Sequence, residues 1–125
     1  MREFDHERLD LYQRALDFCV AANAIRNELP PGRGALSDQL DRAATSIALN
    51  IAEGAGEFAA REKARFYRIA RRSATECAAI LDIAARMGLA NPATSSTAKA
   101  MLREIVAMLV GLAKKMEGVN PSPEP

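Results

Sequence analysis

The sequence predicts an all-α protein, an antiparallel four-helix bundle with up-down-up-down topology. Of its 125 residues 49% are hydrophobic, yet only 5% are aromatic and Trp is absent, so the composition favours Ala-rich helices over a β-sheet. Apolar residues recur at intervals of three and four, as on one face of a helix. Short stretches containing Pro or Gly separate four such segments. We therefore expect one domain over residues 1–118.

The first helix is expected at about residues 7–28, because Pro30 and Pro31 stop it. One apolar track along it has a heptad-like spacing, and a second track lies beside the first. A stripe of this width predicts packing against more than one neighbouring helix. The two tracks are Leu11, Ala15, Phe18, Ala22, Ile25 and Leu29, and Leu9, Tyr12, Leu16 and Cys19.

The second helix is expected at about residues 35–54, after the turn PPGRG. Asp38 and Asp41 are expected in its first turn, where the helix dipole favours acids. Gly54 and Gly56 are expected to end it with a left-handed or open backbone. Its apolar face consists of Leu36, Leu40, Ala43, Ile47 and Ile51.

A row of polar side chains lies on the flank of that apolar face, about 110° away at 100° per residue. The row consists of Gln39, Arg42, Ser46, Asn50 and Glu53. Ser73 and Glu76 of the third helix are candidate partners for this row. One interpretation is an inter-helix network of hydrogen bonds or ion pairs, in which Arg42 faces Glu76 or Glu53 and Asn50 bridges the two helices. The alternative is that these side chains are solvated at the edge of the bundle.

The third helix is expected at about residues 59–87, ended by Gly88. Arg61, Arg65, Arg68 and Arg72 recur at spacings of four, three and four, and Lys63 and Arg71 lie to either side. This basic ridge has two interpretations. It is a solvated face balanced by nearby glutamates, or it is a nucleic-acid-binding site that contacts phosphates.

The fourth helix is expected at about residues 95–117, with Pro92 preceding it and Ser95 or Ser96 as its N-cap. Apolar residues surround most of its circumference, which predicts burial beyond its own bundle and therefore a homo-oligomer. The Pro-rich tail, residues 119–125, is expected to be disordered.

Several classes of protein are excluded by what the sequence lacks. It has one histidine and no ExxH pair, its Gly-rich stretches fit no nucleotide-binding fingerprint, and Ser46 and Ser73 have no histidine partner. We expect a protein that is not an enzyme and needs no cofactor or metal. Cys19 and Cys77 lie within apolar helical patterns and are expected to be buried, reduced thiols.

The net charge of +1 demands neither nucleic acid nor an anionic membrane. The longest apolar run, residues 105–113, is less than half of the roughly 20 residues that span a bilayer. The charged amino terminus lacks the apolar stretch of a signal peptide. We expect a cytoplasmic protein without membrane contact.

Three segments together resemble a known family: QLDRAATSIALNIAEGAGE from Gln39, FYRIARRSATE, and LDLYQRALDF. It is the bacterial four-helix-bundle family encoded in intervening sequences of 23S rRNA genes, related to accessory variability proteins of diversity-generating retroelements. The resemblance covers about Phe4 to Glu117, and the SIxxNIAEG core at residues 46–54 is specific. Where many members have Gly before the Ser of the helix-three motif, this chain has Arg72.

The resemblance implies a bundle that assembles into a ring, typically a homopentamer. The retroelement relatives bind nucleic acid and a reverse transcriptase. The family's polar positions map onto Gln39, Arg42, Ser46, Asn50, Glu53, Ser73 and Glu76. We therefore expect a non-enzymatic, ring-forming scaffold or adaptor that binds RNA or DNA through the basic ridge. The alternative is a purely structural or protein-binding oligomer without nucleic-acid contact.

Overall fold

The computed structural model describes residues 3–118, and the predicted tail at 119–125 lies outside this range. Within it the chain forms one short 3-10 helix and four α-helices, and no β-strand. This confirms the all-α prediction. The elements are η1 (Asp5–Arg8), α1 (Asp10–Glu28), α2 (Gly34–Gly56), α3 (Ala60–Arg86) and α4 (Pro92–Glu117).

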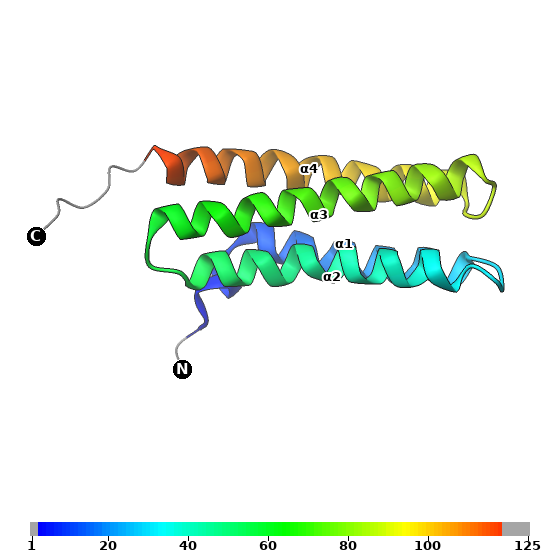
Figure 1. Cartoon of the computed structure of the whole chain (residues 1–125), viewed down its shortest axis with the longest axis horizontal. Helices are drawn as coiled ribbons and strands as arrows, with labels where there is room; N and C mark the ends of the chain where they lie inside the picture. The colour runs from blue at the N-terminus through cyan, green and yellow to red at the C-terminus, as the bar shows by residue number, and fades with distance from the viewer. Residues whose placement is uncertain (1–2, 119–125) are drawn as a thin grey trace, which may run out of the picture.

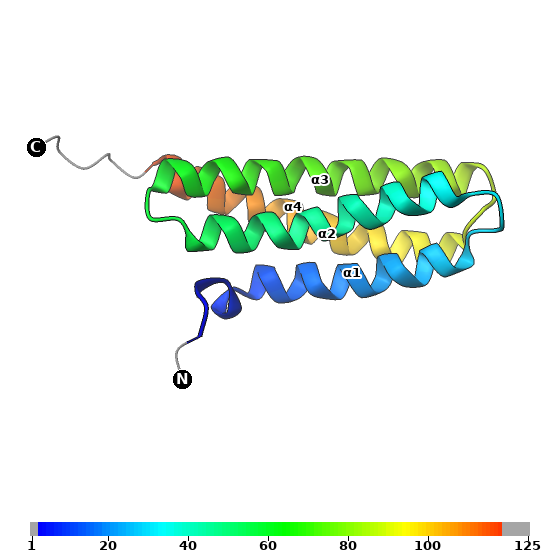
Figure 2. The ribbon, with the colours of Figure 1, turned by 60° about the horizontal axis from the view of Figure 1, so that its bottom comes forward.

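The four helices lie side by side (Figures 1 and 2). The α1–α2 and α3–α4 connections are at one end of the molecule, and the α2–α3 connection is at the other. Helix α3 packs extensively against both α2 and α4, and α1 contacts α2 and α4 less extensively. The two most extensive helix–helix contacts of the bundle are thus both made by α3.

The core repeats at helical spacing on every helix. On α1 the buried residues are those of the predicted heptad-like track, from Leu11 to Ile25, with Phe18 and Ile25 fully buried. On α3 many buried positions are alanines, which lets its neighbours approach closely because Ala adds little bulk. The largest fully buried side chains are Phe18, Ile25, Leu40, Ile47, Ile51, Leu81, Ile105 and Leu109.

The first helix begins later than the sequence predicts. Asp5–Arg8 form the separate turn η1, and Leu9 is extended, with φ −83° and ψ 122°. The backbone N–H of Phe4 donates to the Glu7 carboxylate at 2.9 Å, and the His6 ring meets the edge of Tyr12 at 4.5 Å between centroids. These local contacts stabilise a tight turn in place of another turn of α1.

The second helix ends at Gly56, one of the two glycines predicted to end it, and the other, Gly54, has a different role. Positive φ occurs at Gly32 and Gly88 among the described residues, whereas Gly54 lies inside α2. A Cβ on Gly54 would lie 2.7 Å from Cε1 of Tyr67 and 3.1 Å from Cβ of Phe66. Gly54 is therefore a close-approach residue, which lets the Tyr67 ring pack directly on the α2 backbone.

The acids predicted for the first turn of α2 have another role. Because α2 begins at Gly34, Asp38 and Asp41 lie beyond its first turn. Both face Arg26 of α1, whose guanidinium is 3.2 Å from the Asp41 carboxylate and 3.8 Å from that of Asp38. The Arg26 Nε also donates to Ser37 Oγ at 2.9 Å. These contacts join α1 and α2 next to their connecting turn.

The fourth helix begins three residues earlier than predicted. Asn91 is the N-cap, and its side-chain oxygen accepts from the N–H of Ala93 at 2.8 Å. Pro92 occupies the first helical turn, where a missing N–H costs nothing. Ser95, predicted as a cap, instead lies inside α4 with a buried Oγ that has no hydrogen-bond partner in the described part of the chain.

The most exposed large apolar side chains are not on α4, the helix for which the sequence predicts apolar residues around most of the circumference. Leu102, Ile105 and Leu109 of α4 are buried, and the other large apolar side chains of α4 are partly buried. The large, mostly exposed side chains are found on the other elements and include Val20 on α1, Leu49 on α2 and Phe58 in the α2–α3 loop. Among the described helices none is long and apolar enough to span a bilayer.

Candidate functional site

A small polar cluster joins α2 to α3 in the middle of the predicted polar row. Ser46 Oγ and Ser73 Oγ are 2.8 Å apart. The side-chain amide of Asn50 donates to the Ser46 carbonyl at 2.8 Å and to Ser46 Oγ at 3.0 Å. All three side chains are partly buried. Hydrogen bonds of this kind fix the register of two helices because a shift would leave polar atoms unsatisfied.

The other residues of the predicted network do not join this cluster. Gln39, Arg42, Glu53 and Glu76 are exposed, and their side chains make no hydrogen bond or ion pair within residues 3–118. The predicted pairing of Arg42 with Glu76 or Glu53 is therefore not formed. Full hydration on an exposed flank is as favourable for these groups as a surface ion pair. The network thus consists of uncharged groups bordered by solvated charges.

The basic ridge lies on the outer face of α3. At 100° per residue, Arg61, Arg65, Arg68 and Arg72 fall opposite the buried alanines of the same helix, and all four are exposed. Arg65 pairs with Glu62 at 2.9 Å and lies over the Phe66 ring. Within residues 3–118 the Arg61 and Arg72 side chains make no ion pair.

The remaining ridge cations have different environments. Arg68 pairs with Glu117 of α4 at 2.6 Å, which partly neutralises the middle of the ridge. Lys63 is half-buried, and its ammonium donates to the backbone carbonyls of Ala55 at 2.8 Å and Gly54 at 3.3 Å. Lys63 therefore caps the carboxyl end of α2 and is not free to meet a phosphate. Arg71 is exposed and faces the α4 side of α3.

The two cysteines are free, as predicted from their apolar surroundings, with Cys77 buried and Cys19 partly buried. Burial, followed by the nearby charge of Glu76, raises the pKa of the Cys77 thiol to about 12. Burial also raises the pKa of Cys19 and of Tyr67. Since thiolates are the reactive form, these thiols are poor nucleophiles. Among residues 3–118 no cluster of His, Cys, Asp or Glu could hold a metal ion.

Sequence reasoning missed two features of the surface. One is an ion pair between α1 and α4, in which Arg14 meets Glu104 at 2.5 Å while also bonding Asp10. The other is a pair of hollows between α3 and α4, bordered by cations of α4. Both depend on which helices are neighbours, which the spacing along one helix does not report.

The arrangement defines a four-helix protein with an uncharged inter-helix polar cluster and an exposed arginine row. The chain belongs to the family of 23S rRNA-intervening sequence proteins, whose family model matches residues 7–111. The predicted family is thereby confirmed. No curated protein matches the sequence.

A solved structure supports the fold. It is the 1.70 Å crystal structure of a protein of unknown function from the S23 ribosomal protein family of Bacteroides thetaiotaomicron. The two chains are 22% identical, the match covers 83% of this chain and 98% of the other, and the TM-score is 0.77. At this identity the similarity concerns the fold alone.

Proposed function

We propose that the protein is a non-enzymatic scaffold or adaptor, an antiparallel four-helix bundle that assembles into a homo-oligomeric ring and binds RNA or DNA through the outer face of α3. The observation that carries the proposal is the row of Arg61, Arg65, Arg68 and Arg72, all exposed on one face. Exposed arginines at this spacing match phosphate contact because the guanidinium bonds two phosphate oxygens at once. A ring would repeat the row around its axis, so that the positive fields add.

The contacts of the ridge cations decide which of them we include in the proposed interface. Lys63 is removed from it, because its ammonium is bonded to carbonyls of α2. Arg61 and Arg72 have no ion-pair partner within residues 3–118, so they lose no partner when a phosphate approaches. Arg65 and Arg68 would exchange carboxylates for phosphates. We therefore place the strongest contacts at the two ends of the row.

A second candidate is a structural or protein-binding oligomer, with a reverse transcriptase or another protein as its partner. The observation that favours it is the exposed apolar surface: Phe58 is fully exposed, Val20 is 72% exposed and Leu49 is 64% exposed. Exposed apolar side chains of this size are typical of contacts with other protein chains.

A gel-shift titration with single-stranded RNA and duplex DNA tests the leading candidate. The variant replaces the four row arginines by Glu, and the matched control makes the same charge change at Arg8, Arg33, Arg86 and Lys115. We expect the parent and the control to bind in a salt-sensitive manner and the row variant to lose binding, with the far-UV circular dichroism of all three unchanged. A parent that binds neither nucleic acid at low salt, or a row variant that binds as well as the control, would refute it.

Light scattering tests the ring. We expect a mass several times the 13.5 kDa of one chain. A monomer at micromolar concentration would exclude both the ring and the added field that it supplies.

A further inference from the structure

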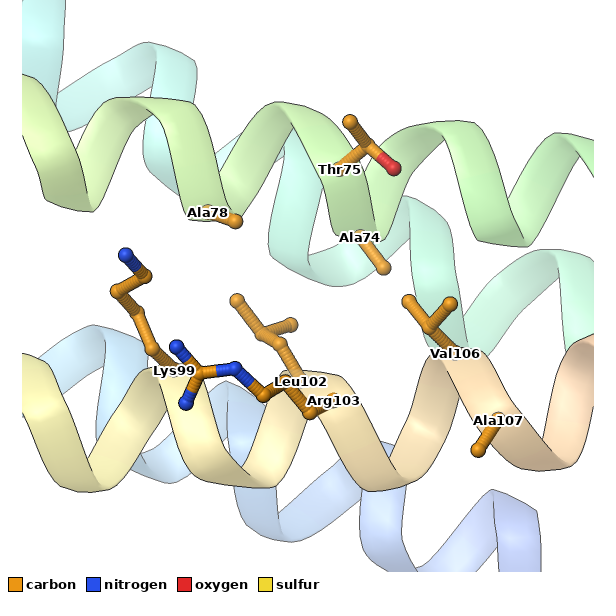
Figure 3. A pocket seen from close by; sticks show the side chains of 8 residues that line it. All are labelled: Ala74, Thr75, Ala78, Lys99, Leu102, Arg103, Val106 and Ala107. Atoms are coloured by element: carbon orange, nitrogen blue, oxygen red, sulfur yellow. The ribbon is translucent and has the colours of Figure 1, made fainter.

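An open hollow of about 320 Å³ lies between α3 and α4 (Figure 3). Ala74 and Ala78 of α3 are too small to fill the space between the helices, and Leu102 and Val106 of α4 point into it. Leu102 is buried, but Ala78 and Val106 are only partly buried. The hollow therefore presents apolar surface to the outside.

Cations border this hollow on α4. Lys99 and Arg103 are one helical turn apart, and both line it (Figure 3). Lys99 pairs with Asp82 of α3 at 2.5 Å. Arg103 is exposed, and its side chain makes no ion pair or hydrogen bond within residues 3–118. Among the described residues, the positive charge of Arg103 thus lies next to the apolar floor without a partner.

A second hollow, of about 190 Å³, continues along the same two helices toward the carboxyl end of α4. Arg71 of α3 and Lys114 of α4 line it, together with the ion pair of Arg68 and Glu117. We call the two hollows together the α3–α4 seam. At 1.5 Å per residue, Arg103 and Lys114 lie about 16 Å apart along α4, or about three helical turns.

We propose that the α3–α4 seam binds an acidic amphipathic helix of a partner protein. Apolar side chains of that helix, at intervals of three and four, would fill the gap beside Ala74 and Ala78, and carboxylates on its flanks would meet Arg103, Arg71 and Lys114. The argument is one of charge complementarity, because the unpaired charges along the seam are all positive in a chain whose net charge is only +1.

Other occupants fit less well. The hollows are too open to enclose a small molecule, which needs most of its surface buried. A nucleic acid would use the cations but gain nothing from the apolar floor of Leu102 and Val106. A helix with both apolar and acidic side chains uses both features. This site lies beside the arginine row of α3 and shares only Arg68 with it.

The probe is a fluorescein-labelled, 18-residue helical peptide with leucines along one face and glutamates on both flanks. Two comparison peptides carry lysine for each glutamate, or serine for each leucine. Fluorescence anisotropy with the full chain measures affinity. We expect micromolar binding of the Leu/Glu peptide, weakened by added salt, and at least tenfold weaker binding of both comparison peptides.

Two variants locate the binding site. Ala78→Phe fills the first hollow, and Arg103→Glu reverses the unpaired charge, so each should weaken the Leu/Glu peptide at least tenfold. Arg33→Glu makes the same charge change at the start of α2, outside both the seam and the arginine row, and should leave affinity within twofold. Circular dichroism verifies folding, and Arg103→Glu decides alone if Ala78→Phe does not fold.

Three results would overturn the proposal: no peptide binding at millimolar concentration, equal binding of the serine peptide, or an unchanged affinity in Arg103→Glu. A 20-nucleotide RNA is titrated in parallel. If Arg103→Glu abolishes RNA binding while the peptide never binds, the seam belongs to a nucleic-acid surface and the proposal is wrong. If the parent protein binds RNA through the arginine row but does not bind the peptide, the seam proposal is wrong and the proposed function still holds.

Discussion

The contact between Gly54 and Tyr67 predicts that Gly54→Ala destabilises the protein, although the same change stabilises most helices. Gly54 lies inside α2, where Ala is favoured over Gly by about 1 kcal/mol. The new methyl group, however, would lie 2.7 Å from Cε1 and 3.0 Å from Cδ1 of Tyr67. Tyr67 is 3% exposed, and the new methyl group would also lie 3.1 Å from Cβ of Phe66, so the packing of α2 on α3 has to shift.

The expected magnitude follows from these two opposing effects. Overpacking a filled core costs about 1–3 kcal/mol. After subtraction of the gain in helix propensity, Gly54→Ala should lower the free energy of unfolding by up to about 2 kcal/mol. For a domain of this size that corresponds to a decrease in Tm of up to roughly 8 °C.

Gly111→Ala is the matched control. Gly111 is also inside a helix, α4, but a Cβ there would meet nothing within 4 Å. It should raise the free energy of unfolding by about 0.5–1 kcal/mol. Urea unfolding, followed by circular dichroism at one protein concentration, compares the two variants. If Gly54→Ala stabilises as much as Gly111→Ala, the close approach of Tyr67 to α2 is wrong.

Two further predictions concern the polar row and the buried thiol. Asn50→Leu removes both hydrogen bonds to Ser46, so it should lower the free energy of unfolding by about 1 kcal/mol and alter the oligomer mass or the dispersion of the NMR spectrum. Arg42→Met should change the free energy of unfolding by less than about 0.5 kcal/mol, because Arg42 is exposed and unpaired within residues 3–118. Equal effects on stability would contradict the observed cluster. Folding raises the pKa of the Cys77 thiol from 9.0 to about 12, so as pH rises this thiol ionises in the unfolded chain before it ionises in the folded protein. Stability is therefore lost as pH rises from about 9 toward 12, by up to about 1.4 kcal/mol per pH unit. Cys77→Ala should reduce that slope in urea unfolding at several pH values, and an unchanged slope would argue against a buried, protonated thiol.

The periodic features of the protein could be predicted from its sequence. The heptad-like track of α1, from Leu11 to Ile25, is buried as expected, and the arginine row of α3 faces outward. Both follow from the 3.6-residue repeat, which places residues three and four apart on one face. The position of the polar row follows from the same repeat, although its charged members, Arg42 and Glu53, are exposed to solvent.

The roles of single residues depended on which surfaces meet in space. Local chemistry predicts Gly54 as one of two helix terminators and Lys63 as a phosphate contact. In the structure Gly54 lies under the Tyr67 ring, and Lys63 caps α2. Pro92 is expected to precede the fourth helix, yet with Asn91 as the cap it is the first residue of α4.

The sequence by itself determined the number of helices, their buried faces and the outward arginine row. Only the tertiary structure decided that Ser46 is hydrogen-bonded to Ser73 and that Arg26 forms ion pairs with Asp38 and Asp41. It also decided that small residues leave a cation-bordered seam between α3 and α4. The physical reason is that periodicity reports the direction of a side chain from its own helix axis, whereas a contact also needs the position and the height of the neighbouring helix.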